Sequence, residues 1–203
     1  VGIGRAIRFY GGYSKEIPKY NIEPSGYTLY VDESAKESRP KTVCAILRDV
    51  PMSEEFLDEM IKIQEKIHDS FGRGRKKAAI GIYPLDNIEF PVTFGAEEPE
   101  KIVFKPLDFD REVNGVELLE VHDTGRKYAH LLDHCDLYPV FRDKKGKILS
   151  VPPIINSQEL GKVDLENKDL FIECSGHNIS HLDNILKVLV TTFIDMGARA
   201  ESV

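Results

Sequence analysis

The sequence predicts an α+β fold: a mixed sheet with several packed helices, in a single compact domain excised from a longer chain. Runs rich in β-branched and aromatic residues alternate irregularly with amphipathic segments of helical period, as is typical of this class. A chain of 203 residues with 41% hydrophobic residues is long enough to bury a substantial core. Because the sequence has no internal repeat and no low-complexity tract, we expect one globular unit.

The two ends of the sequence indicate where the α+β domain begins and which element it ends with. Residues 1–12 read "VGIGRAIRFYGG", with apolar residues at helical spacing and two closing glycines. We interpret them as the tail of a preceding helical element and residues 13–203 as the α+β domain. The closing "GARAESV" is typical of the start of a strand.

The first half of the domain contains two strand-like runs, "YTLYV" at 27–31 and "TVCAIL" at 42–47. A helix follows, because Ser53 is a suitable N-cap, two glutamates suit the first turn, and Gly72 ends the apolar stripe. The run "KKAAIGIYPL" predicts another strand, which ends at Pro84.

The second half begins with a proline-broken stretch and then returns to regular elements. In order, we predict short strands and loops at 86–112, two short helical pieces at 113–132 split at Gly125, a hairpin at 137–151, a strand at 169–174 and a helix at 180–198.

Charge and composition restrict the partners that the chain can have. The formal net charge is −7, so a nucleic acid must be bound by a local cluster rather than by the whole surface. The candidate cluster is Arg73, Arg75, Lys76 and Lys77, although a solvated loop that suits a helix C-terminus is the alternative. Three cysteines form no paired framework and no apolar run is long enough for a membrane span, so we expect a cytoplasmic protein with no membrane partner.

Histidines and cysteines give no sign of a metal or nucleophile site. His177 and His181 lie four residues apart, a spacing that can bind one metal, but they lack a zincin glutamate and a third ligand. We therefore expect no metal. Cys174 falls on the apolar side of its strand, where cysteine is usually a small hydrophobic residue.

One strand carries polar residues where apolar ones are expected. In "LFIECSG", the alternation places Glu173 and Ser175 on one face with Phe171. A carboxylate there must be solvated at a sheet edge, paired, or lining a cavity. Pro152 and Pro153 form a rigid segment nearby in sequence, and such a segment beside a polar strand face is typical of a small-ligand pocket.

These motifs resemble a known family. "YPVFRDKKGKILSVPPIIN" followed by "LFIECSG" is similar to the central region of the β subunit of phenylalanyl-tRNA synthetase in its archaeal and eukaryotic form. Weaker supporting matches are "QEKIHDSFGRGRKKAAIGIYPLDNI", "GRKYAHLL" and "ILKVLVTTF".

The resemblance implies an editing domain that hydrolyses tyrosine wrongly attached to phenylalanine tRNA. Its amino-acid pocket would lie within 138–178 and include Phe141, Ser150, Glu173 and Ser175 as substrate-binding residues, with Glu173 and Ser175 also catalytic. The family commonly has threonine at the position of Ser175 and a smaller aliphatic residue at the position of Phe141. The basic cluster would contact tRNA.

The resemblance also implies partners and cofactors. The remaining β-subunit domains and an α subunit would assemble as α2β2, editing would need no cofactor, and ATP and magnesium would serve only the ligase reaction elsewhere in the enzyme. An alternative is a non-catalytic module that positions tRNA or packs subunits. A cavity beside Glu173 and Ser175 favours editing, whereas pairing with an arginine in packed core favours the module.

Overall fold

A computed structural model describes residues 2–13, 16 and 19–203 of the chain. Within this part the strands form two five-stranded sheets, which confirms the α+β class. The first sheet has the order β1 (Glu23–Pro24), β10 (Arg199–Ser202), β3 (Lys41–Arg48), β9 (Leu170–Gly176), β4 (Ala78–Pro84). The second sheet has the order β2 (Leu29–Val31), β5 (Val92–Glu97), β6 (Tyr138–Arg142), β7 (Ile148–Val151), β8 (Ile155–Asn156).

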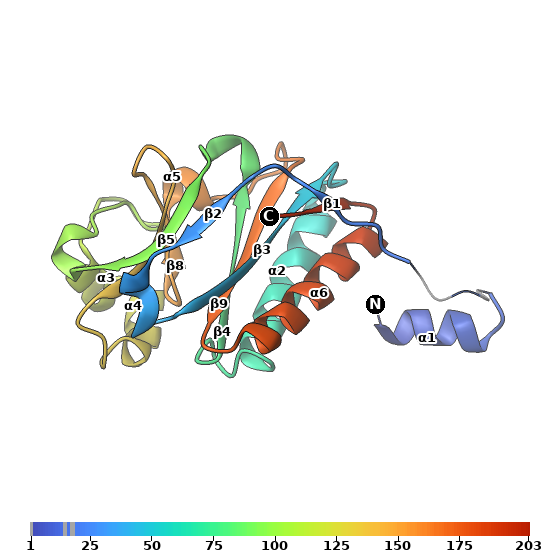
Figure 1. The fold of residues 1–203 in the computed structure, drawn as a ribbon, viewed down its shortest axis with the longest axis horizontal. Coiled ribbons are helices and arrows are strands. Elements are labelled where there is room, and N and C mark those ends of the chain that lie inside the picture. The colour runs from blue at the N-terminus through green and yellow to red at the C-terminus, as the bar shows by residue number, and fades with distance from the viewer. Residues whose placement is uncertain (1, 14–15, 17–18) are drawn as a thin grey trace.

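The helices lie mainly outside the two sheets. Their bounds are α1 Gly2–Tyr10, α2 Glu54–Asp69, α3 Gly115–Val121, α4 Asp123–Tyr128, α5 Gln158–Gly161 and α6 Ile179–Asp195, with short 3-10 turns at Glu33–Lys36, Leu85–Asn87, Pro99–Lys101 and Ala129–Leu131. Figure 1 shows α2 and α6 side by side along β3, β9 and β4, with α3 and α4 at the opposite end of the molecule.

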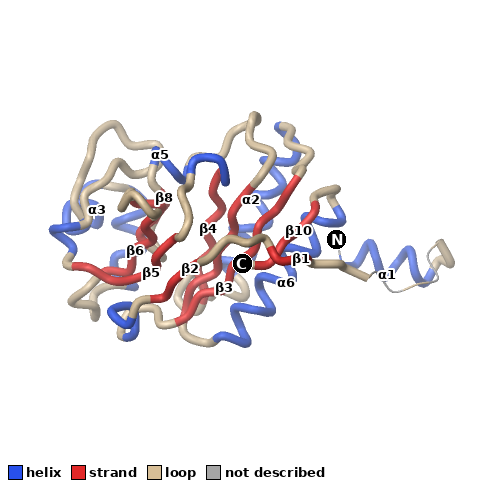
Figure 2. The backbone as a smooth tube through the Cα atoms, turned by 45° about the horizontal axis from the view of Figure 1, so that its top comes forward, coloured by secondary structure: helices blue, strands red, loops and turns tan. Residues whose placement is uncertain are grey.

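Three apolar clusters hold these layers together. One packs α2 and α6 on the outer face of the first sheet and includes Ile172 and Phe193. A second lies between the sheets and includes Phe171 and Phe94. The third joins the second sheet to α3 and α4 and includes Leu118. The order of layers is therefore helices, first sheet, second sheet, helices, and Figure 2 shows the strands of the two sheets as separate groups.

Local sequence explains the long helix near the site. Ser53 caps α2 as predicted, because its side chain accepts a hydrogen bond from the Phe56 backbone N–H. Buried Met60 and Ile67 anchor the helix to the sheet by its apolar stripe.

The break between α3 and α4 lies at His122, not at Gly125 as predicted. His122 has extended backbone angles, and its Nδ1 accepts a hydrogen bond from the Thr124 backbone N–H. Gly125 is inside α4, where a Cβ would come within 1.9 Å of the Leu118 carbonyl oxygen. This glycine therefore allows close packing of two helices rather than ending one.

The amino-terminal helix lies apart from the sheets in Figure 1. None of its described side chains is buried, and Arg5 ties it to the body through Asp195 at 2.7 Å and the Tyr20 hydroxyl at 2.9 Å. The predicted boundary near residue 13 stays a prediction, since residues 1, 14–15 and 17–18 lie outside the described residues. Among the described residues, no helix is long and apolar enough to cross a membrane.

Candidate functional site

The carboxylate of Glu173 lies on the inner face of β9, between the two sheets. Only 1% of the residue is exposed. Its cross-strand neighbours are Cys44 on β3 and Gly81 on β4. Ile172 and Cys174 belong to the cluster on the opposite face, so the strand alternation is as the sequence predicts.

Glu173 is only half satisfied by hydrogen bonds. Its Oε1 accepts a hydrogen bond from the Tyr83 hydroxyl at 3.2 Å, and that hydroxyl also lies 2.8 Å from Ser150 Oγ. The second oxygen, Oε2, has no hydrogen-bond partner among the described residues. Burial raises the pKa of Glu173 to about 8, although the Tyr83 hydroxyl and the Arg39 charge oppose this shift. The site therefore contains a buried acid whose second oxygen has no hydrogen-bond partner among the described residues.

A bulge in the second sheet turns Ser150 toward this acid. Phe141 is paired with Ser150 while Arg142 is paired with Ile148, so the register shifts by one residue at Leu149. Leu149 packs in the cluster between the sheets, and Ser150 also reaches the first sheet through Tyr83. Two successive residues thus face the same way, which strict alternation does not allow.

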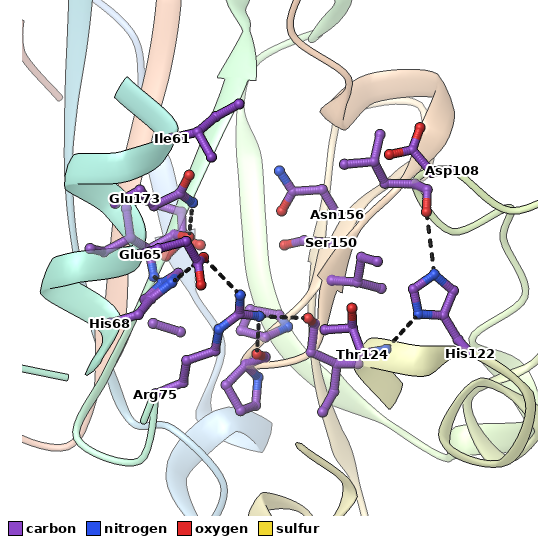
Figure 3. A pocket seen from close by; sticks show the side chains of 18 of the residues that line it. Ile61, Glu65, His68, Arg75, Asp108, His122, Thr124, Ser150, Asn156 and Glu173 are labelled. Carbon is purple, nitrogen blue, oxygen red and sulfur yellow. Dashed lines mark hydrogen bonds and ion pairs between the residues drawn. The ribbon is translucent and has the colours of Figure 1, made fainter. Parts of the chain in front are cut away.

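A pocket of about 620 Å³ lies beside these groups (Figure 3). Glu173 and Ser150 belong to its wall, as do segments of α2, β4, the double-proline turn and the α3–α4 junction. The lining residues are Ile61, Gln64, Glu65, His68, Arg75, Ala79, Ile80, Leu107, Asp108, His122, Asp123, Thr124, Ser150, Pro152, Pro153, Ile154, Ile155, Asn156 and Glu173. Its volume lies within the usual range for small-ligand sites, roughly 300–1,000 Å³.

Arg75 fastens the double-proline turn to α2. Its guanidinium donates hydrogen bonds to the carbonyl oxygens of Pro153 at 3.2 Å and Ile154 at 2.9 Å. It also pairs with Glu65 at 3.0 Å and lies 4.4 Å from the centroid of the Tyr128 ring. Figure 3 shows Arg75 reaching between the two walls of the pocket. The rigid wall that the prolines predict is thus held by an arginine from the basic cluster.

One wall of the pocket follows β4, which is one of the two edge strands of the first sheet. Gln64 donates to the Ile80 carbonyl, and Asn156 donates to the Ile82 carbonyl. His68 Nε2 accepts from the Ile80 backbone N–H at 2.9 Å. Side chains therefore satisfy backbone groups that an edge strand would otherwise leave open.

His68 has no ring nitrogen left for proton transfer. Because Nε2 is an acceptor, Nδ1 carries the hydrogen and donates to Glu65 at 3.1 Å. Burial lowers the pKa of His68, so the ring is neutral. Ser150 contacts a tyrosine hydroxyl rather than a base. The described pocket residues thus contain no paired nucleophile and general base.

The other two predicted pocket residues lie in packed core. Phe141 is fully buried and stacks on Phe94 with ring centroids 4.2 Å apart; it is Ser150's neighbour in the sheet but does not line the pocket. Ser175 is also fully buried, and its Oγ forms no well-aligned hydrogen bond among the described residues, although the hydroxyl lies near enough to Glu173 to help lower the pKa of that carboxyl group. The structure therefore brings Glu173 and Ser150 together at the pocket and leaves Phe141 and Ser175 behind its wall.

Arg39 is a buried cation that the sequence did not single out. Only 4% of the residue is exposed, and its guanidinium donates to the Ser175 carbonyl oxygen at 2.7 Å. It forms no ion pair among the described residues, but its charge lowers the pKa of Glu173. Glu173 lines the pocket, whereas Ser175 does not and contacts Arg39 through its backbone carbonyl. The criterion that names both residues therefore does not decide between editing and a non-catalytic module. A run such as "SRPK" gives no sign that its arginine is buried.

The basic cluster divides into two parts. Arg73, Lys76 and Lys77 are exposed and form no ion pair within the described part of the chain, so the prediction of tRNA contact is kept for them. Arg75 lines the pocket, and its predicted tRNA contact also stays a prediction. His181 contacts the Phe71 carbonyl oxygen, and no cluster of three potential metal ligands occurs in the described residues.

Comparison with known proteins relates the chain to one family, although no family model matches it. The chain is 42% identical over 203 residues to the phenylalanine–tRNA ligase β subunit of Thermococcus kodakarensis, which covers 100% of this chain and 35% of that protein. The corresponding protein of Methanocorpusculum labreanum is 36% identical over 202 residues, covering 100% of this chain and 37% of that protein.

The solved structures agree. A crystal structure of an N-terminal fragment of the phenylalanyl-tRNA synthetase β subunit from Pyrococcus horikoshii superposes with a TM-score of 0.95 at 39% identity. The match covers 100% of this chain and 58% of that fragment. The chain belongs to the phenylalanine–tRNA ligase β-subunit family. It spans about a third of the length of these β subunits, so it corresponds to one region of such a subunit.

Proposed function

We propose that this region is the editing domain of a phenylalanyl-tRNA synthetase, which hydrolyses tyrosine wrongly esterified to phenylalanine tRNA. The observation that carries the proposal is the unpaired oxygen of Glu173: a buried carboxyl group at a pocket wall has one oxygen with no partner in the described chain. An acceptor of this kind suits a ligand that carries a hydroxyl at the end of an apolar ring.

Tyrosine and phenylalanine differ by that one hydroxyl. An apolar pocket that merely has room for a hydroxyl rejects it only by ~10²-fold, so a synthetase selective for phenylalanine benefits from a second site. A site that hydrogen-bonds the hydroxyl reverses the preference, because phenylalanine leaves a buried polar group unpaired. We propose that Glu173 acts in this way.

The raised pKa of Glu173 couples recognition to pH. With a pKa of about 8, the carboxyl group of the empty pocket is mostly protonated at neutral pH. A substrate hydroxyl that donates to Oε2 favours the ionised form and therefore lowers this pKa. Binding of tyrosine then releases a proton, and the preference for tyrosine over phenylalanine rises as the pH approaches and passes 8.

The chemical step that fits the site is attack by a positioned water on the ester carbonyl. Ser150 has no base, and both His68 ring nitrogens are already bonded, so a covalent intermediate has no support in the pocket. Glu173 would bind and orient the amino acid, and the catalytic role of Ser175 stays a prediction. In the whole enzyme we expect an α subunit and the other β-subunit domains as partners, with ATP and magnesium used elsewhere.

A variant of Glu173 tests the proposal. Glu173→Ala removes one charge-assisted hydrogen bond, so hydrolysis of tyrosyl-tRNA should fall by about ten- to a hundredfold. Hydrolysis of phenylalanyl-tRNA should not fall, because the unpaired acceptor that opposes it has gone. An equal loss on both substrates contradicts recognition by Glu173. Unchanged hydrolysis with weakened tRNA binding or subunit assembly would support the non-catalytic module instead.

A further inference from the structure

A tyrosine of the chain itself, Tyr83, is hydrogen-bonded to one of the two oxygens of the Glu173 carboxylate. Tyr83 extends from β4, is fully buried, and stacks on Phe171 with ring centroids 5.7 Å apart. Its hydroxyl donates to Glu173 Oε1 at 3.2 Å. Because that hydrogen is used, Ser150 must be the donor in the 2.8 Å contact with the Tyr83 oxygen. The three groups form a chain of hydrogen bonds directed from Ser150 through Tyr83 to the carboxylate.

Gly81 provides the space for this arrangement. It lies directly opposite Glu173 in the sheet. A Cβ at this position would lie 2.0 Å from the Tyr83 hydroxyl oxygen and 2.6 Å from Glu173 Oε1. The Tyr83 hydroxyl therefore passes over a backbone position that only glycine leaves open. Ring stacking, two hydrogen bonds and this gap together fix the position of the hydroxyl.

We propose that Tyr83 is a positioning residue that determines the preference for tyrosine: it holds Oε1 of Glu173, so that the buried, unpaired Oε2 is the oxygen that a substrate hydroxyl would satisfy. This inference rests on the proposed function. Because Tyr83 holds Oε1, the carboxylate cannot turn without losing this hydrogen bond. A phenylalanine side chain would leave Oε2 unpaired, whereas a hydroxyl-bearing ring would satisfy it.

Other charged and titratable groups also face Glu173 or the pocket beside it. They are Cys44 on β3, Arg39, which donates to the Ser175 carbonyl oxygen, and the pocket-lining residues Glu65, His68, Arg75, Asp108, His122 and Asp123. Cys174 neighbours Glu173 on β9 but lies on the opposite face of the sheet. Among the causes that lower the pKa of Glu173, the Tyr83 hydrogen bond comes first and the charge of Arg39 second. Removal of the hydroxyl should therefore raise this pKa further, since the ionised form loses a donor.

The test is Tyr83→Phe, which keeps the ring and its stacking and removes only the hydroxyl. Tyr138→Phe is the matched control, because it removes a hydroxyl from the second sheet at a residue that does not line the pocket. Hydrolysis of tyrosyl- and phenylalanyl-tRNA is measured between about pH 6 and 9, with the uncatalysed rate subtracted. In parallel, a ¹³C NMR titration follows the carboxyl carbon of Glu173 in each protein.

For Tyr83→Phe we expect tyrosyl-tRNA hydrolysis at pH 7 to fall about tenfold, while phenylalanyl-tRNA hydrolysis stays within about twofold. The NMR midpoint of Glu173 should rise by roughly one pH unit, and Tyr138→Phe should change neither quantity. Equal loss on both substrates with an unmoved midpoint would overturn the inference and leave Tyr83 a purely structural residue. If the unmodified protein shows no preference for tyrosyl-tRNA, the proposed function fails, and the NMR midpoint alone decides whether Tyr83 positions Glu173.

Discussion

The raised pKa of buried Glu173 predicts how the free energy of unfolding changes with pH, and this prediction does not depend on any substrate. Glu173 has a pKa of about 8 in the folded protein and an ordinary value of 4.5 when unfolded. Between these values the folded state holds a proton that the unfolded state has lost, so the free energy of unfolding falls as pH rises. Glu173→Gln removes this titration and keeps the size and polarity of the side chain. The variant should therefore gain stability relative to the parent as pH increases.

The magnitude follows from linkage. When one state is protonated and the other ionised, the free energy of unfolding changes by about 1.4 kcal/mol per pH unit. Full burial means that solvent does not screen the effect. Between about pH 5.5 and 7.5 the variant should gain roughly 2.5 kcal/mol over the parent, which corresponds to a difference in Tm of roughly 5–10 °C for a chain of this size.

Urea unfolding at several pH values measures this difference directly, because all other titrating groups are common to both proteins. Glu166→Gln, which removes an exposed carboxylate, is the control and should give a curve parallel to that of the parent. Parallel curves for Glu173→Gln would refute the reasoning, since they would mean that the carboxyl group ionises in the folded state as it does in water. A difference of opposite sign would show that a partner stabilises the charged form.

Two further predictions concern the basic cluster. Replacing Arg73, Lys76 and Lys77 with alanine should weaken tRNA binding and reduce its salt dependence, without changing the ratio of tyrosyl- to phenylalanyl-tRNA hydrolysis. Filter binding at several salt concentrations measures the affinity and its salt slope. An unchanged salt slope would mean that these residues form a solvated loop that does not contact tRNA. Arg75→Lys should instead lower the free energy of unfolding by about 2–3 kcal/mol, because two carbonyl groups of the double-proline turn lose a planar donor. Urea unfolding at pH 7 measures this change. An unchanged urea midpoint would show that the turn keeps its conformation without this arginine.

Strand patterns predicted much of the site, because side-chain direction in a strand has a fixed period of two. The alternation in β9 places Glu173 and Ile172 on opposite faces of the sheet, as the structure shows. The Ser53 cap likewise depends on local backbone geometry alone. Such features need no knowledge of distant parts of the chain.

Features set by contacts between distant segments were not predictable in this way. The division of strands into two sheets depends on packing, and Ser150 reaches Tyr83 only through a bulge that breaks strand alternation. Arg75 belongs to a basic run whose local pattern indicates solvent, but its partners come from residues 78 and 79 positions further along. Tyr83 looks like an ordinary apolar-strand residue until Glu173 is placed beside it.

The most direct test of the account is a paired deacylation assay. Phenylalanine tRNA is charged separately with tyrosine and with phenylalanine, and the unmodified protein is added to each at pH 7.5. The unpaired oxygen of Glu173 predicts that tyrosyl-tRNA is hydrolysed at least about tenfold faster than phenylalanyl-tRNA, and that the ratio increases toward pH 8.5. Equal rates on the two substrates, or a ratio that falls with rising pH, would contradict recognition of the tyrosine hydroxyl by Glu173.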